Sequence, residues 1–307
     1  MRVTVVGDCT LDVIARPRGA LRPGGDVPAD VAVGPGGQGA NVAVRLARQG
    51  VPVRLVAALA DDHAGRLLAA ALAEEGVELV RLPAARSGTV VALLDEGGER
   101  TMLSDRVSLD PSGLDAAIDG ADWVHASGYA LADAQTGDAL AAALARAHPG
   151  RRVSVAGGSF SPDASSAASL RVRMTTVRPD LLILDRQESQ VVLGGVVRSL
   201  AGGASSLAAA MPGTVAVVTG GAEGSAAAGL AGTVAMTPEA PPPVAVDATG
   251  AGDAYAASLI ATFLGAPWPP GSPTLHEAME RAGEVGAQVS QVMGAQGHVP
   301  AERGLST

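Results

Sequence analysis

The feature that most constrains the fold of this chain is a glycine-rich turn near the C-terminus, followed by a helical pattern. Residues 247–253 read Asp-Ala-Thr-Gly-Ala-Gly-Asp and follow a short apolar run at 244–246. Four apolar residues after the turn recur at the spacing of one helix face. They are Ala256, Leu259, Ile260 and Phe263. The segment therefore predicts an extended strand, a tight turn and a helix over 253–264.

The turn itself predicts an anion site. Gly250, Ala251 and Gly252 are small, so their N–H groups stay uncovered where the helix begins. Unpaired N–H groups and the positive end of the helix dipole favour a phosphate or a developing oxyanion. Two flanking carboxylates, Asp247 and Asp253, would repel that anion. A proton-accepting role for Asp253 beside a phosphate explains the arrangement, and on these residues alone an ordinary helix-start carboxylate explains it equally well.

Two motifs carry a resemblance to a known family. The run at 247–253 with its small-residue helix resembles the C-terminal signature of the ribokinase-like (PfkB) family of sugar and nucleoside kinases. Residues 36–41 resemble the N-terminal signature Gly-Gly-x-Gly-Ala-Asn, with Gln38 where a lysine is usual. The resemblance extends from Gly7 to the loop at 294–297. It implies an enzyme that transfers the γ-phosphoryl group of ATP to a hydroxyl of a small sugar.

The resemblance also implies roles for individual residues at the reaction centre. Asp253 matches the general base, and the N–H groups of the 250–252 turn match the anion hole. Asp12 and Asn41 match residues that hold sugar hydroxyls, since a carboxylate and an amide together accept from and donate to a diol. From the residue type alone, Asn41 could instead cap a helix. The residues matched to the sugar site are Asp12, Gly36, Gly37 and Asn41.

Further along the chain, the resemblance implies a nucleotide and metal site. Residues 185–188 resemble an Asn-x-x-Glu element that positions Mg²⁺, with Asp185 in place of asparagine and Glu188 in the metal environment. Asp185 could equally be a helix N-cap. Residues 219–224 resemble a second nucleotide loop, Thr-x-Gly-x-x-Gly. The matched nucleotide-binding residues are Asp185, Thr219, Gly221 and Gly224.

A monovalent cation is the second ion that the resemblance implies. Asp247 matches a residue of a K⁺ site behind the anion turn, although Ala248 replaces a usual threonine there. Gly157-Gly158 is another departure, because the family often has Asp-x-Asn at that point. The cofactors expected are therefore ATP and Mg²⁺, with K⁺ as a further candidate.

Alternating short apolar strands and helices predict an α/β fold: three layers around a doubly wound, mostly parallel sheet. Binding residues of such sheets gather at the carboxyl ends of strands, where we expect Asp12, Asp185, Thr219 and Asp253. The predicted strands are Val3–Val6, Val53–Ala58, Trp123–Ala126, Val153–Ala156, Leu181–Leu184 and Thr214–Thr219. The predicted helices are 42–49, 64–75, 134–148, 188–193, 204–211, 253–264 and 275–293.

Two segments, about 14–36 and 87–107, are expected to form a small β-sheet lid on a single kinase domain spanning 1–307. Extended runs at 89–94 and 100–103 are joined by a turn-rich segment, which is a hairpin signal. The resemblance allows for a homodimer through this lid. Arg100 and Arg106 lie in the second segment, so an acidic sugar is one substrate that the sequence leaves open.

Composition narrows the function classes. The net charge is −9 and no dense Lys/Arg run appears, which argues against a nucleic-acid partner. No run reaches the ~18 apolar residues of a membrane span, and the N-terminus enters a strand without a leader-like pattern, so we expect a cytoplasmic protein. The single cysteine rules out a Cys-rich metal site. The chain has no lysine, which excludes a P-loop lysine.

Three alternatives remain open from the sequence. A nucleoside kinase would share these motifs, although only 2% of residues are aromatic and Tyr129 is the one candidate for stacking on a base. A nicotinamide-dependent oxidoreductase would use Gly34–Gly39, a weak match because Pro35 sits inside the turn. A non-catalytic sugar-binding regulator would keep Asp12 and Asn41 but would not need Asp253.

Overall fold

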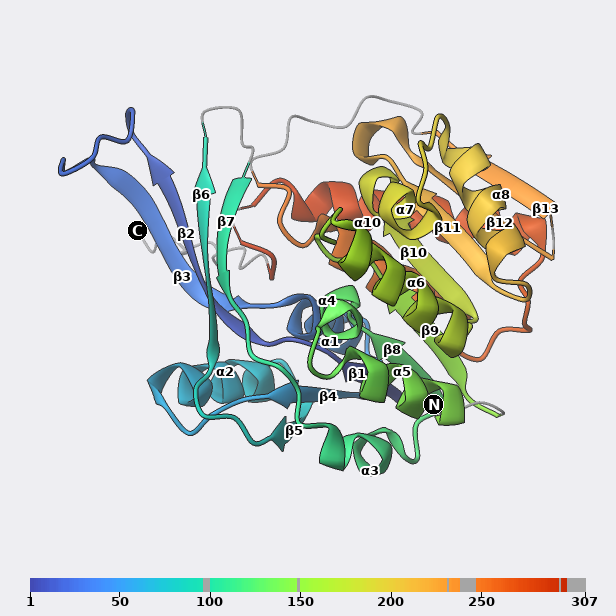
Figure 1. The fold of residues 1–307 in the computed structure, drawn as a ribbon, viewed down its shortest axis with the longest axis horizontal. Helices are drawn as coiled ribbons and strands as arrows, with labels where there is room; N and C mark the ends of the chain where they lie inside the picture. Colours follow the sequence, from blue (N-terminus) through green and yellow to red (C-terminus); the bar gives the residue numbers. More distant parts are fainter. Residues whose placement is uncertain (96–99, 148–149, 231, 238–246, 293, 297–307) are drawn as a thin grey trace, which may run out of the picture.

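The protein is described by a computed structural model that covers residues 1–307 except 96–99, 148–149, 231, 238–246, 293 and 297–307. The largest element is a nine-stranded sheet with the order β13-β12-β11-β10-β9-β8-β1-β4-β5. The strands from β11 to β5 pair in parallel, whereas β12 and β13 add an antiparallel edge. Figure 1 shows helices on both faces of this sheet.

The strands of the large sheet are short and mostly buried. Their apolar sequences suit a sheet that is covered by helices on both faces, because side chains on either face are then buried and a row of polar side chains would be unfavourable. The strands are β1 (Val3–Val6), β4 (Val53–Ala58), β5 (Glu78–Leu82), β8 (Trp123–Ala126), β9 (Arg152–Ala156), β10 (Leu181–Asp185), β11 (Val215–Thr219), β12 (Ser225–Gly229) and β13 (Gly232–Met236).

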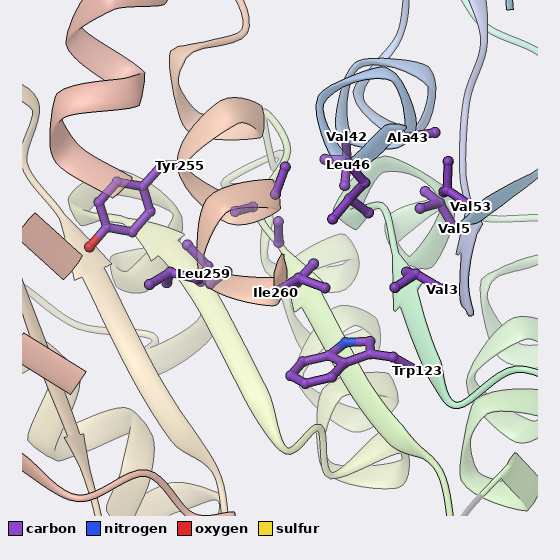
Figure 2. Close-up of a cluster of buried hydrophobic side chains, with 14 of the residues drawn as sticks. Val3, Val5, Val42, Ala43, Leu46, Val53, Trp123, Tyr255, Leu259 and Ile260 are labelled. Atoms are coloured by element: carbon purple, nitrogen blue, oxygen red, sulfur yellow. The ribbon is translucent and has the colours of Figure 1, made fainter. Parts of the chain in front are cut away.

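Two hydrophobic clusters fill the space between the large sheet and the helices on its two faces. One face packs against α1 (Gln38–Arg48), α2 (His63–Glu74), α9 (Ala251–Phe263) and α10 (Ser272–Val289). The other face packs against α3 (Leu114–Ile118), α4 (Gly128–Ala132), α5 (Gly137–Ala147), α6 (Ala164–Val177), α7 (Arg186–Leu193) and α8 (Leu200–Ala210). In Figure 2, side chains of α1 (Val42, Leu46) and of α9 (Leu259, Ile260) lie over the strands. The two helices that carry the signature motifs therefore share one core.

A second sheet stands apart from the first, on the left side of Figure 1. Its four strands have the order β3-β2-β6-β7, with β2 and β6 parallel in the centre. They are β2 (Thr10–Pro17), β3 (Ala29–Gly36), β6 (Gly88–Leu94) and β7 (Arg100–Asp105). Only three residues, 7–9, separate β2 from the end of β1, so the base of this small sheet is joined directly to the large one.

The predicted fold class is confirmed, and so is the separate small sheet. All six predicted strands are present within a residue or so of their expected bounds. All four face residues of the helix after the turn are buried. The extended run at 244–246 lies outside the described residues. Among those that the structure describes, no helix is long and apolar enough to span a membrane.

Several element predictions were wrong in detail. Helix α6 and strands β5, β12 and β13 were not predicted. Helix α1 begins at Gln38, so Asn41 lies in its first turn and is not its cap; Gly37 is the N-cap. Strand β2 begins at Thr10, which places Asp12 in the small sheet and not at the carboxyl end of a large-sheet strand. Asp12 is carried to the site by the second sheet.

Candidate functional site

A cavity of about 290 Å³ lies where the carboxyl ends of β9, β10 and β11 meet the small sheet and the first turns of α1 and α9. Most of the residues predicted from the motifs line it. They are Asp12, Gly37, Asn41, Asp185, Glu188, Thr219, Gly250, Gly252 and Asp253. Residues more than two hundred positions apart in the chain therefore line one cavity.

The glycine turn opens helix α9 by a backbone conformation that requires glycine. Gly250 is the N-cap of the helix and has φ of 80°. A Cβ atom at Gly250 would lie 2.7 Å from the Cα of Ala295. The Ala251 N–H donates a long hydrogen bond to the Ala248 carbonyl oxygen, with 3.3 Å between nitrogen and oxygen. Gly252, in contrast, faces open space, so the turn is fixed on one side and accessible on the other.

Asn41 and Asp253 are joined directly. The Asn41 side-chain amide donates to Asp253 Oδ2 at 2.8 Å. The amide oxygen of Asn41 accepts a bond from Gln296 Nε2 at 3.3 Å, and Asn41 is buried. This explains why Asn41 is not a helix cap: its side chain is used across the core between α1 and α9. The contact also fixes one oxygen of the Asp253 carboxylate.

Asp12 is oriented by its own strand and by the neighbouring one. The Thr10 hydroxyl donates to Asp12 Oδ1 at 2.6 Å. On β3, opposite, a Cβ atom at Gly36 would lie 2.0 Å from Asp12 Oδ2. Gly36 does not line the cavity, and its role in the site is to leave room for the Asp12 carboxylate.

Asp185 and Glu188 form a capping box at the start of α7. Asp185 Oδ1 accepts from Glu188 N–H, and Glu188 Oε2 accepts from Asp185 N–H, each at 2.7 Å. The structure therefore supports the N-cap interpretation of Asp185, and both carboxylates also line the cavity. Burial, together with the smaller effect of the charges of Asp185 and Asp253, raises the pKa of Glu188 to about 8. A carboxyl group in such surroundings favours a nearby cation.

The Gly157-Gly158 departure has a steric cause. A Cβ atom at Gly157 would lie 1.8 Å from Glu188 Oε2, and one at Gly158 would lie 2.9 Å from the backbone nitrogen of Tyr129. Side chains at these two positions would displace both neighbours. The Glu188 carboxylate thus occupies space that is available only because residue 157 is glycine.

Asp247 lies behind the turn and outside the cavity lining. It is buried, and its carboxylate accepts from Thr249 N–H at 2.9 Å, from the Thr249 hydroxyl and from Gly294 N–H at 2.9 Å. These three donors are uncharged. Asp247 therefore ties the turn to the loop after α10 while its negative charge stays inside the protein.

The loop at 219–224 contributes less than expected. Thr219, at the end of β11 beside Asp185, lines the cavity, whereas Gly221 and Gly224 do not. The loop is joined to α7 by a 2.7 Å ion pair between Arg186 and Glu223. Ala251 also lies outside the lining. In the part of the chain that the structure describes, no cluster of three or more His, Cys, Asp or Glu side chains is arranged to hold a metal ion.

Sequence reasoning assigned no site role to several polar or flexible residues at the cavity. Thr10 and Met102 line it, and Asp8 lies behind it. Asp8 is the residue that follows the first strand and its glycine, a position typical of sites in parallel sheets, and this was the available signal. Gln38 and Tyr129, noted only as departures or alternatives, also line the cavity.

The match to a family model decides what kind of protein this is. A model described as pfkB family carbohydrate kinase matches residues 1–302. The chain belongs to this family. As a pfkB family carbohydrate kinase, it is a phosphotransferase that acts on a sugar hydroxyl. Membership removes the oxidoreductase alternative, and the fold agrees: Gly34–Gly36 end a strand of the small sheet and do not follow β1.

Curated relatives of this pfkB family kinase include two fructokinases. The Klebsiella pneumoniae protein is 31% identical, with 97% of this chain and 96% of the relative covered. The Vibrio alginolyticus protein is 28% identical, with 99% and 97% covered. Among solved structures, a Vibrio cholerae fructokinase with fructose, ADP and calcium bound has a TM-score of 0.77 at 26% identity, covering 96% and 94%. A Thermotoga maritima ribokinase has a TM-score of 0.72 at 19% identity, covering 96% and 94%, and shows the same fold.

The two glycines of the turn give a matched pair of variants. Gly250→Ala should lower the free energy of unfolding by about 1–3 kcal/mol, because it places a side chain at positive φ and against Ala295. Gly252→Ala should change it by less than about 1 kcal/mol, because no atom lies within reach and α9 accepts alanine. Urea unfolding of both variants measures the difference. Equal destabilisation would contradict the geometry described for the turn.

Proposed function

We propose that this carbohydrate kinase transfers the γ-phosphoryl group of ATP to a hydroxyl of a small neutral sugar, fructose being the first candidate. The observation that carries the proposal is the hydrogen bond between Asn41 and Asp253, which unites the sugar-side and phosphate-side motifs in one cavity. The similarity to a fructokinase described with fructose and ADP bound supports the choice of substrates.

Asp253 acts as the general base. Its carboxylate takes the proton of the attacking sugar hydroxyl as the oxygen forms a bond to the γ-phosphorus. The bond from that phosphorus to the bridging oxygen breaks, and ADP leaves with the electron pair. The Asn41 amide orients Asp253 by holding Oδ2. Asp253 lies in the first turn of α9, where the helix dipole stabilises negative charge.

The turn at 250–252 serves as the anion hole. Its N–H groups stand at the N-terminus of a 13-residue helix and would stabilise charge that spreads over the transferred group. Asp12 and Asn41 would bind sugar hydroxyls, while Thr219 and the 221–224 loop would contact the nucleotide.

The donor set fits Mg²⁺ bound mainly through phosphates. Asp185, Glu188 and Asp253 bring several carboxylates to one cavity, and the raised pKa of Glu188 reflects their mutual repulsion as well as burial. Mg²⁺ prefers one or two carboxylates plus phosphate oxygens and water, which agrees with the lack of a protein-only metal cluster among the described residues. Asp185 and Glu188 would hold it. When bound, the ion offsets negative charge on the phosphates.

The small sheet, strands β2, β3, β6 and β7, acts as a lid within a single kinase domain. It supplies Asp12, Val90 and Met102 to the cavity, so its movement would control entry of bulk water and favour transfer to the sugar. A nucleoside acceptor is the alternative of the same chemistry. The names of the curated relatives favour a sugar. The cytoplasmic location and the absence of nucleic-acid and membrane partners stay predictions.

Asp253→Asn tests the mechanism. The amide keeps the shape of the side chain but cannot accept the proton, so kcat should fall by ~10²–10⁴-fold. Calorimetric binding of sugar and nucleotide should stay within a few-fold of the wild type. Coupled assay of ADP release measures kcat, and circular dichroism checks the fold.

The matched control is Asp12→Asn, the same chemical change on the sugar side of the cavity. It should raise KM for the sugar much more than it lowers kcat. Near-normal kcat in a folded Asp253→Asn protein would overturn the assignment of the base. Loss of sugar binding with unchanged kcat would make Asp253 a substrate ligand only.

Dependence on K⁺ is expected from the surroundings of Asp247. A buried carboxylate needs a compensating charge when its donors are uncharged, as are those of Asp247 among the described residues. A solved fructokinase variant is described with potassium bound. Activity should rise severalfold when K⁺ replaces tetramethylammonium at constant ionic strength. A flat response in the wild type, or an unaltered response in Asp247→Ala, would remove Asp247 from this role.

A homodimer through the small sheet is expected from its apolar outer surface. Val31 and Val33 on β3 are each 59% exposed, as is Leu103 on β7. Val33→Glu should shift the protein toward monomer in light scattering, because a charge on that face opposes close packing. Val172→Glu, on the exposed side of α6, is the matched control and should not alter the mass. A monomeric wild type at high concentration would contradict the proposal.

A further inference from the structure

One arginine reaches the cavity from the small sheet. Arg106, directly after β7, lines the cavity. Its guanidinium lies over the ring of Tyr129, with Cζ 3.7 Å from the ring centroid. The Tyr129 hydroxyl donates to Ser159 at 2.9 Å, which holds the ring in place. Arg106 is therefore stacked on one side and faces the cavity beside Met102 and Tyr129.

Behind Arg106 lies a carboxylate that is largely covered by the protein. Arg106 Nη1 donates to Asp8 Oδ2, and the Asp8 side chain is only 9% exposed. The other Asp8 oxygen, Oδ1, accepts from the Ser127 hydroxyl at 2.9 Å. Asp8 does not line the cavity. A substrate thus meets the guanidinium of Arg106 but not the carboxylate that neutralises it.

The lining of the cavity is rich in carboxyl groups, so the pairing of Arg106 with Asp8 affects which substrates can bind. Four carboxyl groups line it, those of Asp12, Asp185, Glu188 and Asp253. Within the lining that the structure describes, Arg106 is the single cationic side chain, and Asp8 already balances its charge. The cavity therefore repels an acceptor that carries a carboxylate or a phosphate, in addition to the phosphates of the nucleotide.

We infer that the Asp8–Arg106 pair, stacked on Tyr129, determines substrate specificity: it makes this site select neutral sugars and reject sugar acids. The inference rests on the proposed sugar-kinase function. Arg106 remains able to donate its other N–H groups to an uncharged hydroxyl. A substrate carboxylate, in contrast, would meet a guanidinium whose charge Asp8 already balances. Drawing Arg106 fully toward that carboxylate would leave the largely covered Asp8 charge without its partner, which is costly.

This reverses the interpretation that the sequence left open for Arg106. An arginine near the sugar ordinarily indicates recognition of a carboxylate by paired hydrogen bonds. Here the acidic partner is supplied by the protein itself, from the end of β1. Replacing Asp8 by a neutral isostere should leave the positive charge of Arg106 unbalanced, so that the guanidinium can bind a substrate carboxylate. The site should then accept sugar acids better.

The test compares D-fructose with 2-keto-D-gluconate, which differs only in a carboxylate at C1. In the wild type, kcat/KM should favour fructose strongly. Asp8→Asn should raise the ratio of kcat/KM for the acid over fructose by about tenfold or more, the size of one charge-assisted hydrogen bond. Calorimetric binding of 2-keto-D-gluconate should tighten in parallel. The double variant Asp8→Asn/Arg106→Gln should lose this gain.

Arg146→Gln is the matched control, because Arg146 pairs with exposed Asp115 and neither residue lines the cavity; its acid-to-neutral ratio should match the wild type. If Asp8→Asn does not fold, Arg106→Gln is the test variant. It should lower the ratio of kcat/KM for the acid over fructose below that of the wild type. A wild type that prefers the acid, or an unchanged ratio in both folded variants, would overturn the inference. A wild type that phosphorylates no neutral sugar would instead overturn the proposed function.

Discussion

The contact on which the site depends is the hydrogen bond from Asn41 to Asp253, made across the seam between α1 and α9. It exists because Val42 and Leu46 of α1 and Leu259 and Ile260 of α9 are buried in the same cluster on one face of the sheet. That packing fixes the first turns of both helices relative to each other. A carboxylate and an amide separated by 212 positions can then meet at 2.8 Å.

The second constraint is an excess of negative charge in a chain without lysine. Asp8, Asp12, Asp185, Glu188 and Asp253 all lie in or directly behind the cavity, and Arg106 is paired with the first of them. The capping box and the Asn41 amide satisfy individual oxygens but add no positive charge. Binding of an anionic nucleotide therefore depends on cations and on the backbone dipoles at the start of α9, which is the division of labour proposed for Mg²⁺, K⁺ and the turn.

Local patterns were sufficient for much of the fold and for the motif residues. The α9 face and the apolar strands have clear periodicity, whereas α6 is rich in Ser, Thr and Arg and shows no continuous apolar face in its sequence. Strand β12, Ser-Ala-Ala-Ala-Gly, has low strand propensity and is specified by pairing with β11 and β13. The position of Asp8 after β1 could have marked it as a site residue, but its pairing with Arg106 could not be predicted, because the two are 98 positions apart and no local spacing relates them.

The Gly157-Gly158 pair connects these observations. Glycine at 157 admits the Glu188 carboxylate, and glycine at 158 allows Tyr129 to approach. Tyr129 then supports Arg106, whose charge Asp8 neutralises. Gln38 completes the arrangement, because its amide nitrogen donates to the Gly157 carbonyl oxygen while its oxygen accepts from Gly128 N–H. A lysine at 38 could not accept that second hydrogen bond and would add a positive charge to the cavity lining. The departures at 38 and 157–158 thus belong to one arrangement, which leaves the part of the cavity near Arg106 without excess positive charge.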